Sequence, residues 1–148
     1  MLTVIIDART DPKRLATLLG QLVAGVVEGL IRQVLVVADA SELGVTELCE
    51  ESGAAACQTL DAAGRAALGD WVMVLPARLR FRDGWIASLT AYGADAQRAA
   101  MVVGLSEGGL FGRRPIGVLV ERGRLLDGRG ADLQRLRRDL GWRPVRIG

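Results

Sequence analysis

The side chains best suited to chemistry follow the first two apolar runs of the chain. Arg9 and Asp11 come just after the first run, and Asp39 and Ser41 come just after the second. If both runs are parallel strands, their carboxyl ends meet at one edge of the sheet, which is where α/β proteins bind ligands. A carboxylate there accepts from a base N–H or a ribose hydroxyl, and an arginine pairs with a phosphate. These four residues are candidate nucleotide contacts, while Asp11 and Ser41 are equally suited to cap the helices that follow.

Two further arginines, Arg113 and Arg114, lie in the glycine-rich segment SEGGLFGRRP. This segment precedes an apolar run, whereas a phosphate-binding glycine loop opens a helix so that backbone N–H groups face the phosphates. It is therefore not a dinucleotide or P-loop fingerprint. The two arginines are either a clamp for the diphosphate of an anionic ligand or ordinary solvated loop charges.

The absence of histidine removes several classes of chemistry. Without it the chain has no Ser-His-Asp or Cys-His nucleophile, no histidine base and no Cys/His zinc site. Cys49 and Cys57 are too few for a disulfide framework, so we expect two buried, reduced thiols. Any reaction must rest on carboxylates or arginines.

The net charge of +2 hides a difference between the two halves of the chain. Residues 1–77 carry 5 basic and 10 acidic side chains, whereas residues 78–148 carry 14 basic and 7 acidic ones. The basic half either binds an anion or docks on an acidic partner, or it reflects compositional bias, since 18 of the 19 basic residues are arginine. Few aromatic side chains accompany the arginines, so nucleic acid is not an expected partner.

Apolar runs alternate with amphipathic segments along the whole chain, which predicts strands connected by helices. Strands are expected over 2–6, 34–37, 54–57, 71–76 and 116–121. Helices are expected from residue 12 onward, between 41 and 53, and over 61–68, 85–92 and 131–140. The first helix places Leu15, Leu18, Leu19, Leu22 and Val23 at spacings of three and four. The pattern predicts an α/β/α sandwich with a mostly parallel sheet.

The length of 148 residues fits one compact domain. No apolar run approaches the roughly 18 residues of a membrane span, and the first residues, MLTVIID, lack the basic region and cleavage site of a signal peptide. We therefore expect a cytoplasmic protein without a transmembrane segment.

Four segments in order resemble a family 2 glycosyltransferase with the GT-A fold, over nearly the whole chain. They are LTVIIDARTDPKRLATLL (2–19), VLVVADASELGVTEL (34–48), GRAALGDWVMVLPARLRF (64–81) and DLQRLRRDLGWRPVRI (132–147). The resemblance implies a single GT-A-like domain with a nucleotide-binding half, residues 1–77, and an acceptor-side half, residues 78–148. The second half is basic and shorter than usual for the family, which implies reduced acceptor recognition.

The departures from the family pattern fall on its catalytic carboxylates. The metal-binding Asp-x-Asp motif corresponds to Pro76, Ala77 and Arg78, and the late Glu-Asp pair that supplies the base corresponds to Arg129 and Gly130. The resemblance thus implies a nucleotide or nucleotide sugar as ligand, no divalent metal or other cofactor, and catalysis that is impaired or lost.

Two alternatives stay open. One is an active, metal-independent glycosyltransferase in which Arg78 replaces the cation on the diphosphate, with Arg113 or Arg114 as a further part of the clamp; the missing carboxylate base counts against it. The other is a non-enzymatic interaction module whose basic C-terminal half contacts a protein partner, an anionic lipid surface or a second copy in a homodimer.

Overall fold

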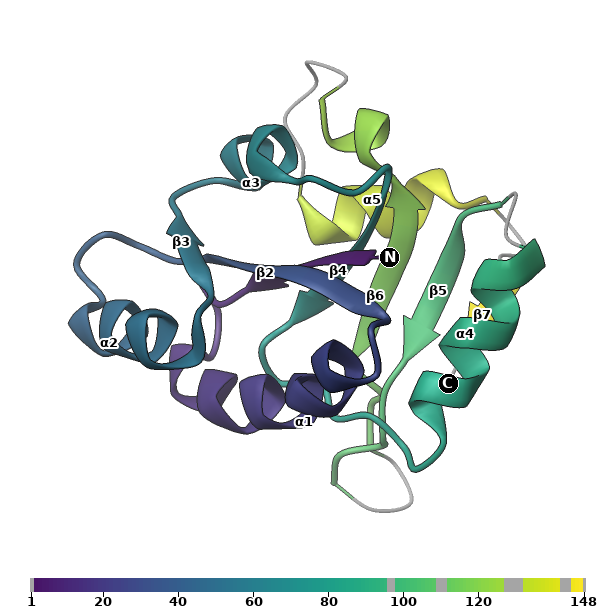
Figure 1. Cartoon of the computed structure of the whole chain (residues 1–148), viewed down its shortest axis with the longest axis horizontal. Coiled ribbons are helices and arrows are strands. Elements are labelled where there is room, and N and C mark those ends of the chain that lie inside the picture. The colour runs from purple at the N-terminus through teal and green to yellow at the C-terminus, as the bar shows by residue number, and fades with distance from the viewer. Residues whose placement is uncertain (1, 96–97, 109–111, 127–131, 142–144, 148) are drawn as a thin grey trace.

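The computed structural model describes residues 2–95, 98–108, 112–126, 132–141 and 145–147, in which helices and strands alternate (Figure 1). The strands are β1 (Leu2–Asp7), β2 (Ile31–Val37), β3 (Ala55–Cys57), β4 (Trp71–Pro76), β5 (Ala100–Val103), β6 (Ile116–Glu121) and β7 (Val145–Ile147). The helices are α1 (Leu15–Val27), α2 (Leu43–Ser52), α3 (Leu60–Ala66), α4 (Trp85–Asp95) and α5 (Leu133–Asp139), with 3-10 turns η1 (Pro12–Arg14) and η3 (Arg122–Leu125).

The strands form one seven-stranded sheet in the order β3-β2-β1-β4-β6-β5-β7. β3, β2, β1 and β4 are parallel to one another, and β5 is parallel to β7. β6 is antiparallel to both of its neighbours, β4 and β5. The central strands are apolar without alternation because both of their faces are covered, as the four consecutive buried residues of β1 and of β4 show. The prediction of a mostly parallel sheet is confirmed.

Helices cover the sheet on both faces and bury a separate core on each. One core packs α1, α2 and α4 against side chains such as Val4, Ile6 and Leu75. The other packs α3, η3 and α5 against side chains such as Ile5 and Val74. This is the expected α/β/α sandwich. No helix in the described part of the chain is long and apolar enough to cross a membrane.

Several local expectations need correction. Val23 does not join the buried stripe of α1, because it faces outward and is 56% exposed. Asp11 precedes η1 in a left-handed conformation and its side chain makes no cap hydrogen bond. Ser41 does not cap α2 either, since Glu42 occupies the N-cap position without a side-chain bond. The predicted stop at Gly53 is confirmed, because this residue ends α2 with a positive φ of 78°.

Neither β5 nor the C-terminal strand β7 has a counterpart among the predicted strands. The three residues of β7 pair in parallel with β5, at the edge of the sheet. Three residues are too few to display a period of two, so only the pairing partner defines the strand. Cys49 is buried and Cys57 is half-buried, and both are free thiols, close to the expectation.

Candidate functional site

An open cavity of about 510 Å³ lies at the carboxyl ends of β1 and β4, where α5 begins. Its walls come from the loop after β1, the end of β4, the start of β6 and the first turns of α5. The lining residues are Asp7, Thr10, Asp11, Pro76, Arg78, Ile116, Asp132, Leu133, Gln134 and Arg137. The cavity therefore joins segments from both the acidic and the basic half of the chain.

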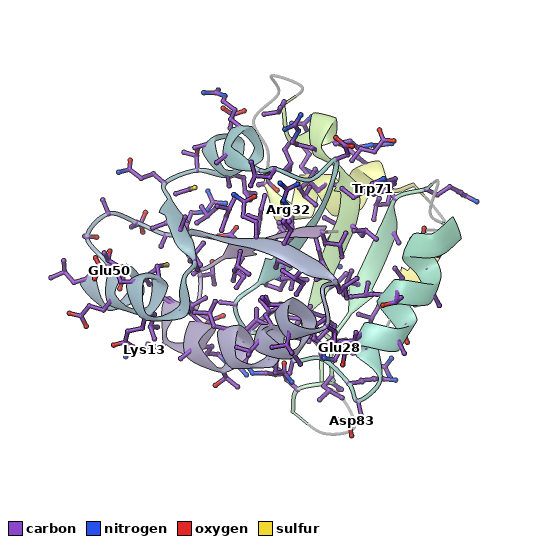
Figure 2. All side chains as sticks on the ribbon, viewed as in Figure 1. Lys13, Glu28, Arg32, Glu50, Trp71 and Asp83 are labelled. Atoms are coloured by element: carbon purple, nitrogen blue, oxygen red, sulfur yellow. The ribbon has the colours of Figure 1, made fainter. Side chains whose placement is uncertain are left out.

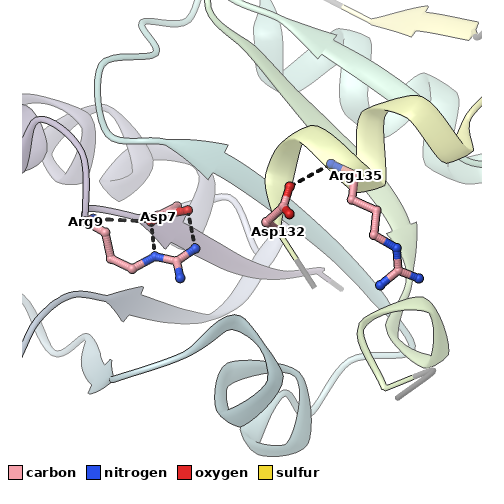
Figure 3. Close-up of polar contacts among 4 residues, drawn as sticks. All are labelled: Asp7, Arg9, Asp132 and Arg135. Atoms are coloured by element: carbon pink, nitrogen blue, oxygen red, sulfur yellow. Dashed lines mark hydrogen bonds and ion pairs between the residues drawn. The ribbon is translucent and has the colours of Figure 1, made fainter. Parts of the chain in front are cut away.

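Asp7 and Arg9 form a bidentate pair beside this cavity (Figure 3). Arg9 Nε donates to Asp7 Oδ1 at 3.0 Å, and Arg9 Nη2 donates to Asp7 Oδ2 at 2.8 Å. The hydrogen bond that Arg9 donates to Asp7 is the main cause that raises the pKa of Arg9, and the charges of Asp132 and Asp39 add to it while burial opposes it. Arg9 is thus ion-paired with Asp7 at the end of β1 and lies within electrostatic reach of Asp132 and Asp39.

Asp132 brings a further carboxylate to the cavity wall. It occupies the N-cap position of α5, where its Oδ1 accepts from the backbone N–H of Arg135 at 2.7 Å. Figure 3 shows it at the start of α5, with Asp7 between it and Arg9 in this view. This capping hydrogen bond holds one carboxylate oxygen, so the position of the Asp132 side chain depends on where α5 begins.

Arg78 and Arg137 bring positive charge to the cavity, and neither is hydrogen-bonded or ion-paired to a carboxylate among the described residues. Arg78 is exposed just after β4 and has no hydrogen bond or ion pair there. Arg137 projects from α5, and its buried Nε has no partner in the described part of the chain. Two guanidinium groups without carboxylate partners form a favourable environment for an anion such as a phosphate.

Arg80 holds the loop that carries Arg78. Its Nη1 donates to the carbonyl oxygens of Ala77 at 2.9 Å and Leu79 at 2.7 Å, and its Nη2 donates to the carbonyl oxygen of Arg14 at 2.9 Å. Burial lowers the pKa of Arg80, and the neighbouring charge of Arg14 lowers it further. One side chain therefore ties the loop after β4 to the turn η1, which follows Asp11.

The residues at the position of the glycosyltransferase metal do not suit a divalent cation. Pro76 and Ala77 have no ligating side chain, and Arg78 carries a positive charge. Within residues 2–95, 98–108, 112–126, 132–141 and 145–147, no three histidine, cysteine or acidic side chains gather closely enough to hold a metal. Of the three carboxylates that line the cavity, Asp7 is paired with Arg9 and Asp132 accepts from a backbone N–H at the start of α5, while Asp11 makes no side-chain cap bond.

The structure brings some of the predicted site residues together and leaves others apart. Asp11 and Arg78 line the cavity, and Arg9 and Asp39 lie near enough to interact electrostatically. Ser41 is exposed in the turn between β2 and α2. Arg113 and Arg114 are exposed in the connection between β5 and β6 and do not line the cavity.

Two residues of the site, Asp132 and Arg137, were not predicted from the sequence. Arg129 and Gly130, where the resemblance places the family's base, lie outside the described residues. The signal for the missed pair was present, because both residues lie in the last of the four matching segments, 132–147. Recognising them required knowing that α5 starts next to the ends of β1 and β4.

No protein-family model matches the chain, and no curated protein resembles it significantly in sequence. Solved structures do resemble it in fold. Glucosyl-3-phosphoglycerate synthase from Mycobacterium tuberculosis, solved with Mn²⁺, UDP and glucosyl-3-phosphoglycerate, superposes with a TM-score of 0.60 at 13% identity over 83% of this chain and 57% of that chain. Mannosyl-3-phosphoglycerate synthase from Rubrobacter xylanophilus gives 0.55 at 18% identity over 69% of this chain and 39% of that one.

A 4-diphosphocytidyl-2C-methyl-D-erythritol synthase also resembles the chain, with a TM-score of 0.60 at 14% identity over 99% of this chain and 87% of that one. The protein thus has the GT-A-like fold of nucleotide-sugar and nucleotidyl transferases, as the sequence resemblance implied. The chain spans well under two thirds of the two phosphoglycerate synthases, but most of the length of the cytidyl transferase. At these identities the likeness establishes the fold alone.

Proposed function

We propose that this protein binds a nucleoside diphosphate or a nucleotide sugar in the cavity at the ends of β1 and β4, without a divalent cation. The observation that carries the proposal is the pair of guanidinium groups, Arg78 and Arg137, that line this cavity without a hydrogen-bonded or ion-paired carboxylate among the described residues. The diphosphate would accept from both, and Arg78 would stand where the family pattern has a metal ligand. Fold relatives solved with UDP make a nucleotide the natural anion to test.

In this proposal the carboxylates serve the nucleoside and the arginines serve the phosphates. Asp11 and Asp39 would accept hydrogen bonds from ribose or base, with Ser41 at the edge of the same turn. Arg9 is already committed to Asp7, so its contribution is to keep the acidic end of β1 from repelling the phosphates. Arg113 and Arg114 would form a weaker, outer clamp on the diphosphate.

We further propose that sugar transfer is impaired or absent. Departure of a nucleoside diphosphate needs positive charge at the phosphates, which the arginines supply, but the acceptor hydroxyl also needs a base. Losing such a base costs about 10² to 10⁴ in rate.

A second candidate is an active, metal-independent glycosyltransferase. The observation in its favour is Asp132, an acidic side chain that lines the same cavity as Asp7. Its carboxylate would have to leave the backbone N–H of Arg135 to take a proton. The candidate therefore predicts sugar transfer that persists in EDTA and is lost in Asp132→Asn.

Thermal denaturation with UDP, GDP, CTP and UDP-sugars, each with and without Mn²⁺, tests the binding proposal. Ligand at about 100 times its Kd stabilises the folded state by about 2.7 kcal/mol, or about 5 to 10 °C for a chain of this size. Arg78→Met and Arg137→Met should each weaken binding about 10-fold to 150-fold, because each removes charge-assisted hydrogen bonds.

Arg32→Met is the matched control, since Arg32 is exposed near the amino end of β2, at the opposite edge of the sheet (Figure 2). The control should bind like the wild type. No stabilisation by any nucleotide, or stabilisation that appears only with Mn²⁺, would contradict the proposal.

A further inference from the structure

The helix α1 exposes an apolar face that nothing in the described chain covers. Its inner residues, including Leu18 and Leu22, are buried against the sheet. The outward residues Gly20, Val23 and Val27 recur at spacings of three and four, and the two valines are 56% and 80% exposed. No charged residue occurs in the whole helix, LATLLGQLVAGVV, whereas the solvent face of a surface helix is normally polar.

Gly20, in the middle of this face, packs against no other part of the chain that the structure describes. A Cβ added at this position would meet no atom within 4 Å. Glycine is nevertheless among the poorest residues for a helix interior, so its presence has no local benefit. Its lack of a side chain would let a second helix approach closely at this point, because the distance between packed helices depends on the side chains at their contact.

Charges of opposite sign flank the apolar face at its two ends. Lys13 lies in the turn η1 before α1, and Glu28 follows its last residue; both are exposed and lie at opposite ends of the helix (Figure 2). Gly20 lies almost midway between them in the sequence. A second α1 crossing antiparallel at Gly20 would therefore place each Lys13 opposite the Glu28 of the other copy. Such a self-complementary pattern is what a two-fold interface requires.

We propose that α1 is a homodimer interface, in which two copies of this chain pack their α1 helices antiparallel about a two-fold axis near Gly20. The apolar face supplies the buried contact and the two Lys13–Glu28 pairs set its direction. A membrane surface is a poorer occupant, since interfacial helices combine their apolar face with lysines, arginines and aromatic side chains, none of which α1 contains. The inference is independent of nucleotide binding.

Size-exclusion chromatography with light scattering, from about 1 to about 200 µM protein, tests this interface. The wild type should change from the mass of one chain to that of two as its concentration rises. Val23→Glu should stay monomeric over the whole range, because it buries a charge in the apolar contact. Leu43→Glu is the matched control: Leu43 is 74% exposed on α2, and its variant should dimerise like the wild type.

Charge exchange tests the antiparallel arrangement itself. Lys13→Glu and Glu28→Lys should each weaken the dimer about tenfold, because each change places two like-charged pairs at the rim. The double variant Lys13→Glu/Glu28→Lys should restore wild-type association, which only an interface between copies of this chain can do. A wild type that is monomeric throughout, a dimeric Val23→Glu, a double variant no better than the singles, or binding of the monomer to lipid vesicles through α1 would each overturn the proposal.

Discussion

Replacing Arg80 by methionine should lower the stability of the protein markedly, although Arg80 is not itself one of the buried core residues. Methionine keeps most of the length of the side chain but removes the donors to the carbonyl oxygens of Ala77, Leu79 and Arg14. Leaving part-buried carbonyl groups without a partner costs about 1 to 3 kcal/mol. The three losses do not add fully, because water reaches part of this site.

The lowered pKa of Arg80 indicates that part of this destabilisation is offset. Burial and the charge of Arg14 both lower it, which means that holding the cation here is itself unfavourable and that methionine relieves this cost. We therefore expect a net loss of about 2 kcal/mol, or about 4 to 8 °C in Tm. Differential scanning calorimetry of wild type and variant, without ligand, measures it directly.

Arg78→Met is the matched control for this substitution. Arg78 lies two residues away, is exposed and has no partner in the described chain, so its variant should change stability by no more than about 0.5 kcal/mol. The effects of the two substitutions should thus differ: Arg80→Met should lower Tm, and Arg78→Met should lower the affinity for nucleotides. Equal Tm values for Arg80→Met and the wild type, or an equal drop for both variants, would refute this reasoning.

Two further predictions follow from the packing of the chain. Gly117→Ala should destabilise the protein by about 2 to 3 kcal/mol, because a Cβ there would lie 2.6 Å from the carbonyl oxygen of Val74. Gly44→Ala should instead stabilise it by about 0.5 to 1 kcal/mol, because a Cβ there would have no atom within 4 Å. Urea denaturation of both variants checks this contrast. Burial, with a smaller contribution from Cys57, raises the pKa of the Cys49 thiol. The stability that the protonated thiol contributes is therefore complete below the pKa of Cys49 in the unfolded chain, and it is lost as the pH rises through the pKa of Cys49 in the folded protein. In Cys57→Ser protein at pH 8, iodoacetamide should therefore label Cys49 at least about tenfold more slowly than it labels the urea-unfolded chain, and equal rates would contradict the assigned burial.

Much of this fold could be predicted from the sequence because buried parallel strands have a strong local signature. β1 and β4 are covered on both faces, so each appears as an uninterrupted apolar run. The polar residues that follow such runs lie at one edge of the sheet by geometry, which is why Asp11 was expected there, whereas Arg78 was expected from the family resemblance; both line the cavity. Spacings of three and four likewise identified α1 and its buried leucines, although the apolar character of Val23 did not show which way it faces.

The remaining features depend on which distant segments become neighbours. β6 lies antiparallel between β4 and β5. Its apolar sequence does not reveal this direction, because a buried strand has the same composition whether it runs parallel or antiparallel to its neighbours. The same strand order carries α5 to the cavity, so that Asp132 and Arg137 meet Asp11, more than 100 residues earlier in the chain. Residue types and local periodicity therefore determined the elements and the edge of the sheet at which the candidate site lies. The charges that face one another across that edge were decided only by tertiary structure, because their separation depends on the order of the strands and not on their spacing in the sequence.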